Sequence, residues 1–235
     1  MSMRLDKYIS NTTSYSRKDV RGLLKRGTVT INGERAKAPD QKVDEVADVI
    51  CIEGQIIQYR EFLYLMLNKP QGYLSATEDD RDPVVTDLVP EEWKHFQVFP
   101  VGRLDKDTEG LLLLTNDGHF AYELTSPKKN RYKRYFARLD RPAETADIAE
   151  FAKGMEFQDF TAKPARLEID PDDPTQVYVE IAEGKFHQVK RMCERVGKTV
   201  IYLKRVSMDQ LQLDPALPLG SVRELTADEM KLLGF

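Results

Sequence analysis

The stretch Gly102–Gly118, GRLDKDTEGLLLLTNDG, decides how the rest of this sequence is interpreted. It places an arginine, an aspartate and a threonine in a loop bounded by glycines, and it ends at an Asn-Asp-Gly turn. Between them, the four leucines Leu111–Leu114 have the composition of a buried strand. A carboxylate on a loop that a buried strand braces can hold one reactive oxygen still. Asp105 is therefore a candidate catalytic residue.

Two other interpretations of this loop stay open at the level of the motif. Asp105, Asp107, Glu109 and Gly110 occupy the first, third, fifth and sixth positions of a calcium-binding loop. The twelfth position, which requires a bidentate glutamate, is Asn116, and the leucine run predicts a strand where an EF-hand needs a helix. The second alternative is an acidic, solvated turn in front of a core strand.

Composition limits the class of protein. A chain of 235 residues suits one large or two small domains, and 41% hydrophobic with 31% charged residues is typical of globular proteins. No apolar run approaches the ~20 residues of a membrane span, and the first residues lack the apolar core of a signal peptide, so we expect a cytoplasmic protein. Cys51 and Cys193 lie far apart, and neither they nor the three histidines show metal-ligand spacing. We expect free thiols, no metal and no cofactor.

The charge is distributed unevenly. The net charge is −4, yet residues 1–37 carry nine basic residues against three acidic ones. Residues 127–138 carry six basic residues and no acid, and residues 184–205 carry seven against Glu194 alone. Such blocks suggest that one side of the protein attracts a polyanion. Any one block alone could equally be an ordinary solvated face.

Residues 3–58 have the pattern of a small separate module. Ser16–Asp19 predicts a capped helix start, and Gly27 predicts its end. Residues 29–34 predict a strand with an Asn-Gly hairpin, and residues 49–57 predict a second pair of strands.

With Arg4–Lys7 in front, this order of parts resembles the RNA-binding module first seen in ribosomal protein S-four, the alpha-L motif. The resemblance implies that the helix and the hairpin bind structured RNA through its phosphates. The candidate RNA-binding residues of the module are Arg4, Lys7, Arg17, Lys18, Arg21, Lys25 and Arg26.

After a short polar linker at residues 59–61, residues 62–235 predict a second domain. Strand-like segments outnumber helical ones and do not alternate strictly with them, which indicates an α+β fold with a largely antiparallel mixed sheet flanked by helices. The predicted strands are 62–68, 98–101, 111–115, 133–139, 165–169, 176–181, 200–206 and 210–213, and the predicted helices are 119–124, 143–153, 187–196 and one starting at the capping box Thr226–Glu229.

Four segments of this domain resemble, in order, the pseudouridine synthases of the ribosomal large- and small-subunit family. They are LNKPQGY at 67–73, the Asp105 loop, KRYFARL at 133–139 and EGKFHQVKRM at 183–192. The resemblance spans about residues 62–230. It implies that the protein isomerises uridine to pseudouridine in RNA, a reaction without redox change, net hydrolysis or cofactor.

The resemblance also implies roles for individual residues. Asp105 attacks the sugar or removes a sugar proton, and the sequence does not choose between the two. Lys190 is the cation that keeps Asp105 ionised; many relatives have arginine there, whereas lysine offers a point charge. Tyr135 packs on the target uracil, although a strand tyrosine can also be plain core. Arg103 fills the space that the flipped base leaves or holds a flanking phosphate, unless it only pairs with a neighbouring acid.

Further candidate RNA contacts lie in the same segments: Lys133, Arg134, His187 and Arg191. The alternative for Lys190 and Arg191 is that they are ordinary basic residues on a helix. Lys69 either supports the floor of the active site or contacts RNA, and we favour the structural role.

The string HQVKRM at 187–192 resembles the 16S-directed (RsuA-type) branch of the family, whereas large-subunit relatives more often carry an Asn-Arg-Glu-Val-Arg-Arg type of string. We therefore expect a monomer that modifies one uridine of 16S rRNA, within an assembling small subunit. The alternatives are a synthase acting on 23S rRNA and a non-catalytic RNA-binding assembly factor whose catalytic loop has become structural.

Overall fold

The computed structural model describes residues 2–235 and divides into two compact units. The first unit comprises the chain up to Leu63 together with Val89–Val98, and the second comprises Tyr64–Leu88 and Phe99–Phe235. The division falls just after the linker expected at residues 59–61. The segment 89–98, which the sequence boundaries placed in the second domain, groups with the first unit.

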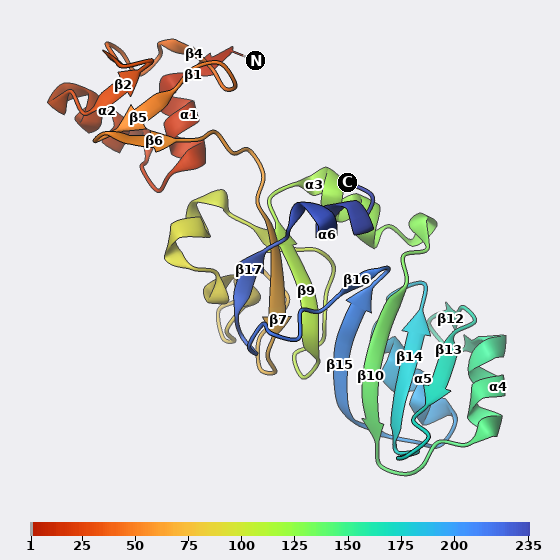
Figure 1. Cartoon of the computed structure of the whole chain (residues 1–235). Helices are drawn as coiled ribbons and strands as arrows, with labels where there is room; N and C mark the ends of the chain where they lie inside the picture. Colours follow the sequence, from red (N-terminus) through yellow and green to blue (C-terminus); the bar gives the residue numbers. More distant parts are fainter. Residues whose placement is uncertain (1) are drawn as a thin grey trace. The chain divides into compact units, whose positions relative to one another are not determined.

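Two helices and two small sheets form the first unit (Figure 1). Its four-stranded sheet has the order β3-β2-β5-β6, and β1 pairs with β4. The elements are β1 (Ser2–Arg4), α1 (Leu5–Thr12), α2 (Arg17–Arg26), β2 (Val29–Ile31), β3 (Glu34–Arg35), β4 (Lys42–Asp44), β5 (Ile50–Ile52), β6 (Gln55–Ile57) and the 3₁₀ helix η2 (Glu91–Phe96).

Helix α2 begins and ends where the sequence predicts. The Ser16 hydroxyl accepts a hydrogen bond from the Asp19 amide at 3.2 Å, and the Asp19 carboxylate accepts one from the Ser16 amide at 2.9 Å. Gly27 ends the helix in the left-handed region, at φ 75°. The hairpin between β2 and β3 likewise turns at Asn32 and Gly33, both with positive φ. The capping box, the glycine stop and the Asn-Gly hairpin are confirmed.

One nine-stranded sheet organises the second unit, with the order β13-β14-β10-β15-β9-β7-β17; β16 pairs with β15 and β8 with β9 (Figure 1). Among the described residues, every pair in this sheet is antiparallel except β9 with β15, which confirms the α+β assignment. Its strands are β7 (Tyr64–Lys69), β8 (Phe99–Pro100), β9 (Glu109–Thr115), β10 (Lys133–Leu139), β13 (Arg166–Ile169), β14 (Gln176–Ile181), β15 (Val200–Met208), β16 (Leu211–Gln212) and β17 (Val222–Glu224).

The parallel contact between β9 and β15 is short. It joins only Glu109 with Lys204 and Gly110 with Arg205, so the sheet consists of two halves that meet along this seam. Gly110 has φ 101°, and a Cβ atom there would collide with the carbonyl oxygen of Arg205. Only glycine fits both the backbone conformation and the close approach of the two strands.

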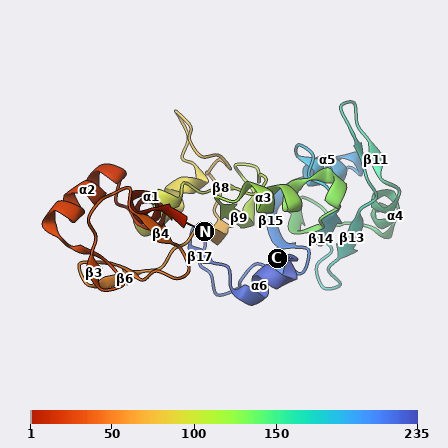
Figure 2. The same ribbon diagram turned by 90° about the horizontal axis from the view of Figure 1, so that it is seen from above.

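Helices cover parts of both halves. Leu111–Leu114 are completely buried, since packing covers both faces of β9. Both views place α4 beside β13 (Figures 1 and 2). The remaining elements are the 3₁₀ helices η1 (Val85–Leu88) and η3 (Pro127–Lys129), α3 (Gly118–Thr125), α4 (Thr145–Lys153), the hairpin of β11 (Met155–Glu156) with β12 (Thr161–Ala162), α5 (Gln188–Arg195) and α6 (Ala227–Leu232).

None of the helices in the described part of the chain combines the length and the apolar character needed to span a bilayer.

Candidate catalytic site

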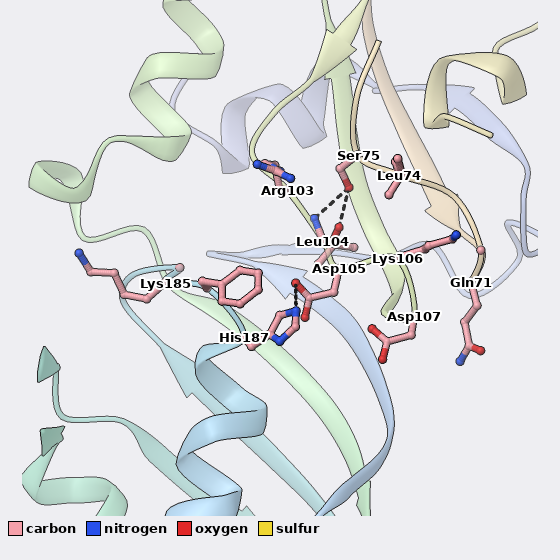
Figure 3. Close-up of a pocket in the computed structure, with 13 residues that line it drawn as sticks. Gln71, Leu74, Ser75, Arg103, Leu104, Asp105, Lys106, Asp107, Lys185 and His187 are labelled. Atoms are coloured by element: carbon pink, nitrogen blue, oxygen red, sulfur yellow. Dashed lines mark hydrogen bonds and ion pairs between the residues drawn. The ribbon is translucent and has the colours of Figure 1, made fainter. Parts of the chain in front are cut away.

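A cavity of about 700 Å³ opens in the second unit between the Asp105 loop and the turn before α5. Residues 103–107 line one side, residues 184–187 line another, and Gln71, Gly72, Leu74 and Ser75 contribute the rest (Figure 3). Three of the four segments that resemble the synthase family therefore converge on one cavity, although they lie far apart along the chain.

Asp105 faces this cavity with two basic side chains beside it. The Lys190 Nζ atom lies 3.2 Å from Asp105 Oδ2, and the His187 Nε2 atom lies 3.6 Å from Asp105 Oδ1. Figure 3 shows the His187 ring turned toward the carboxylate. The Asp105 side chain is 26% exposed, so its oxygens are accessible to a bound molecule while a cation holds their orientation.

Lys190 is shared between two carboxylates, because its Nζ atom also lies 2.6 Å from Asp107 Oδ1. Burial disfavours its charge, but the hydrogen bond to Asp107 and the charge of Asp105 outweigh burial and raise the pKa of Lys190. Burial also acts against the charge of Asp107, and the Lys190 ammonium outweighs it, so the pKa of Asp107 is lowered. Both shifts favour the charged forms of Lys190 and Asp107.

Lys69, at the end of β7, anchors the main chain of the catalytic loop. It is completely buried, and its Nζ atom donates to the carbonyl oxygens of Pro70 (3.0 Å), Asp105 (3.1 Å), Lys106 (3.3 Å) and Thr108 (2.9 Å). Burial lowers the pKa of Lys69 to about 8, even though the carboxylates of the loop act in the opposite direction. These contacts support the structural role over RNA contact.

A second set of hydrogen bonds braces the loop from the segment after β7. The Ser75 hydroxyl donates to the Leu104 carbonyl oxygen at 2.9 Å and accepts from the Leu104 amide at 3.0 Å, as drawn in Figure 3. The Gly72 amide donates to the Lys106 carbonyl oxygen at 2.8 Å. With Lys69, these bonds fix the backbone on both sides of Asp105, which is the preorganisation that a reactive carboxylate needs.

Tyr135, on β10, lies deeper than Asp105. It is 7% exposed and lines a smaller cavity of about 60 Å³ together with Asp105, Val189 and Leu203. The structure thus brings Asp105, Tyr135 and Lys190 together from three different elements. Asp105 comes from the β9 half of the sheet, whereas Tyr135 and Lys190 come from the β15 half and the helix before it.

The basic residues expected at the RNA divide into two groups. Arg103 is exposed and lines the large cavity with His187. The acids that could have paired with Arg103 have other partners: Lys190 binds Asp107, and the Tyr202 hydroxyl donates to Glu109 at 2.7 Å. Arg103 therefore remains a candidate RNA contact.

Lys133, Arg134 and Arg191, which are expected at the RNA, each make contacts within the protein. Lys133 is 9% exposed and donates to the Arg131 carbonyl oxygen, while burial lowers its pKa to about 8. Arg134 is paired with Glu168 at 3.0 Å. These side chains make contacts within the protein, which their position in a basic block does not reveal.

Arg191 is held by the hairpin of β11 and β12. Its guanidinium lies 4.7 Å from the ring centroids of both Phe157 and Phe160, and it donates to the Asp159 carboxylate at 2.9 Å. A guanidinium that contacts two neighbouring rings and a carboxylate of the same hairpin serves to fix this hairpin.

In the first unit, the expected RNA contacts mostly point to solvent. Lys7 is exposed, and so are the five basic residues of α2, Arg17, Lys18, Arg21, Lys25 and Arg26. Arg4 differs, because its guanidinium donates to both carboxylate oxygens of the buried Asp6, at 3.0 and 2.8 Å. This hydrogen bonding lowers the pKa of Asp6.

The calcium interpretation of the Asp105 loop is wrong, because β9 begins at Glu109 and no helix follows the loop. Within the part of the chain that the structure describes, no group of three or more His, Cys, Asp and Glu side chains is placed to hold a metal ion.

Comparison with known proteins agrees with this geometry. The RNA pseudouridylate synthase family matches residues 63–195, and the S4 domain family matches residues 3–50. The chain is 48% identical to an uncharacterized RNA pseudouridine synthase of Bacillus subtilis, over 98% of both chains. It is 38% identical to ribosomal small subunit pseudouridine synthase A of Escherichia coli, over 97% of this chain and 98% of that protein.

A solved structure described as a pseudouridylate synthase superposes with a TM-score of 0.69 at 35% identity, over 98% of this chain and 99% of the other. The same relationship thus appears in the sequence and in the fold. The chain belongs to the RNA pseudouridylate synthase family, with an S4 domain preceding the synthase domain.

Proposed function

We propose that this protein converts one uridine of 16S rRNA to pseudouridine, with Asp105 as the catalytic residue. One observation carries the proposal: the Asp105 carboxylate faces a cavity of about 700 Å³ and is held by Lys190 at 3.2 Å. Membership of the family supplies the reaction. The small-subunit substrate is supported by the name of the Escherichia coli relative and by the HQVKRM string at 187–192.

The reaction breaks the bond between C1′ of the ribose and N1 of uracil, with the bond electrons leaving on the base. The base turns over, C5 bonds to C1′, the proton on C5 leaves, and N1 takes up a proton, so the product is an isomer of the substrate. Asp105 either attacks the sugar or removes a sugar proton, and both routes need an ionised carboxylate. Lys190, at 3.2 Å, supplies the charge that orients it. Tyr135 lies where it can pack against the uracil.

RNA reaches the site with help from both units. The exposed cations of α2 attract phosphates, and Arg103 offers a further cation beside Asp105. The target must leave its stack to reach Asp105, which costs a few kcal/mol. We infer that the protein acts as a monomer, on rRNA in an assembling small subunit.

The test is to incubate the purified protein with unmodified 16S and 23S transcripts, alone and with ribosomal proteins, and to map pseudouridine by chemical labelling and primer extension. We expect a single stop in 16S rRNA. It should vanish with Asp105→Asn and persist with the matched control Asp228→Asn, whose carboxylate is 89% exposed on α6.

A stop only in 23S rRNA would keep the chemistry and overturn the substrate. Binding of RNA without any stop would put the non-catalytic assembly factor in first place. Partial activity in Asp105→Ala would remove Asp105 from the central role.

A further inference from the structure

An exposed aromatic ring stands at the rim of the catalytic cavity. Phe186 is 71% exposed and lines the same cavity as Asp105. Its ring stacks on His187, with a centroid distance of 3.8 Å and an interplanar angle of 17°. A single exposed apolar side chain is ordinary in itself, so the exposure carries little weight alone. The stack and the location carry the argument, because His187 lies directly beside Asp105.

The turn that carries Phe186 is held in place by Gln188, which is 3% exposed. The Gln188 side chain accepts from the Lys185 amide at 3.0 Å and donates to Glu183 at 3.1 Å, while its own amide donates to the Lys185 carbonyl oxygen at 3.1 Å. His187 adopts φ 51°, in the left-handed region. One face of the Phe186 ring is therefore covered by a fixed imidazole, and the other face is open.

We propose that Phe186 and His187 form a stacking platform for the unpaired nucleobase next to the target uridine. This inference rests on the proposed function and adds a second base-binding site to it. Nucleobases of any sequence can stack on such a surface, since every base presents a π-face.

The platform suits a neighbouring base better than the target itself. Tyr135, which lines the inner cavity, is 7% exposed, whereas Phe186 is 71% exposed and lines only the outer one. When the sugar of the target reaches Asp105, its base enters beside Tyr135 and the next base along the chain lies at the rim. Lys185 and Arg103 also line the outer cavity, where their charges match the phosphates between the two nucleotides.

The test compares Phe186→Ala and Phe186→Trp with the wild type on a synthetic RNA that contains the mapped target. Base–aromatic stacking of ordinary strength corresponds to a roughly 5- to 150-fold effect on affinity. We expect Phe186→Ala to raise Kd and KM by a factor in this range and to leave kcat at saturating RNA unchanged. Phe186→Trp should bind as tightly as the wild type. The control is Tyr122→Ala, which removes a 55% exposed aromatic ring from α3, and it should change neither constant.

A thermodynamic cycle identifies the base. An abasic nucleotide is placed on each side of the target in turn, and Kd is measured with the wild type and with Phe186→Ala. At the nucleotide that stacks on the platform, Phe186→Ala and the abasic substitution together should weaken binding no more than either one does alone. Fully additive effects at both neighbours, or an unchanged Kd in Phe186→Ala, would overturn the platform while the active wild type upholds the proposed function. A wild type and a Tyr122→Ala control that both make no pseudouridine would overturn the proposed function, and the platform with it.

Discussion

Helix α2 of the first unit and the catalytic region of the second are both rich in basic residues, but they use them differently. The cations of α2 point to solvent. Around the site, three of them instead make contacts within the protein: Lys69 binds four carbonyl oxygens, Lys190 binds two carboxylates, and Arg191 binds an aspartate and two neighbouring aromatic rings. Basic residues are thus available to bind RNA on α2, whereas several of those near the catalytic site stabilise the protein itself.

The difference predicts how much each residue matters. A buried ammonium must be matched by acceptors, so removing it leaves those acceptors without a partner. An exposed cation contributes only when a phosphate is bound. Substitutions inside the second unit should therefore cost stability or turnover, whereas substitutions on α2 should change only RNA affinity.

The largest effect is expected at the ion pair of Lys198 with Asp147, where the charged atoms lie 2.7 Å apart and both side chains are 8% exposed. Lys198→Met leaves a buried carboxylate unpaired and should lower the free energy of unfolding by about 3–5 kcal/mol. The control Lys153→Met breaks the exposed pair with Glu150 and should cost ~0–1 kcal/mol. Urea denaturation measures the free energy of unfolding of both variants. Equal losses would contradict the expectation that a buried cation contributes more to stability than an exposed one.

Lys190→Met should reduce turnover by a factor on the order of 10²–10³, because the charge that orients Asp105 is removed. Affinity for RNA should change little. Lys190→Arg should retain most of the activity, since a guanidinium can serve the same two carboxylates. Single-turnover kinetics on rRNA measures the rate of the chemical step and the affinity for RNA separately. A Lys190→Met variant that reacts as fast as the wild type would show that Lys190 does not orient Asp105.

Lys69 gives a pH-dependent effect. Its pKa is about 8 in the folded protein and 10.5 in the unfolded reference, so the unfolded chain binds more protons between these values. The contribution of Lys69 to the free energy of unfolding should therefore rise as pH increases from about 8 toward 10.5.

The difference in unfolding free energy between the wild type and Lys69→Met, followed across this pH range, isolates the residue. A difference that does not vary with pH would show that Lys69 does not titrate there.

The smallest effect is expected on α2. Replacing Arg21 and Lys25 by alanine should weaken RNA binding and reduce the slope of log K against log salt by roughly one for each phosphate that is no longer bound. The free energy of unfolding should stay within about 0.5 kcal/mol of the wild type, because both side chains are exposed. Binding isotherms at several salt concentrations give the slope, and an unchanged slope would place the RNA elsewhere.

The sequence predicts the regular elements well and the short ones poorly. Strands β10 and β14 have the predicted bounds, since seven and six residues suffice to show alternation. Strands β1, β4, β11, β12 and β17 were not predicted, because each has only two or three residues and neither a longer apolar run nor an Asn-Gly turn marks it. Helix α1 was also missed, since its N-cap, Arg4, makes no side-chain cap hydrogen bond.

At the site, motif resemblance selected the residues that converge on the cavity, because a motif records side chains that act together. It assigned Lys133 and Arg191 to RNA, since a block of charge does not show which way each side chain turns. The contacts of Arg191 come from the hairpin of β11 and β12, and Asp159 in this hairpin lies 32 residues before Arg191. Such contacts become visible only in the folded protein.

The seam at Gly110 and Arg205 also has a consequence for how the protein gains activity as it folds. Strands β13, β14, β10 and β15 can pair among themselves, and so can β7 and β9, whereas the seam and the pairing of β17 with β7 both require closure of long chain segments. Asp105 lies on one side of the seam, and Tyr135 and Lys190 lie on the other. During refolding, enzymatic activity should therefore return after most of the secondary structure has formed. The recovery of turnover then reports when the two halves of the sheet join.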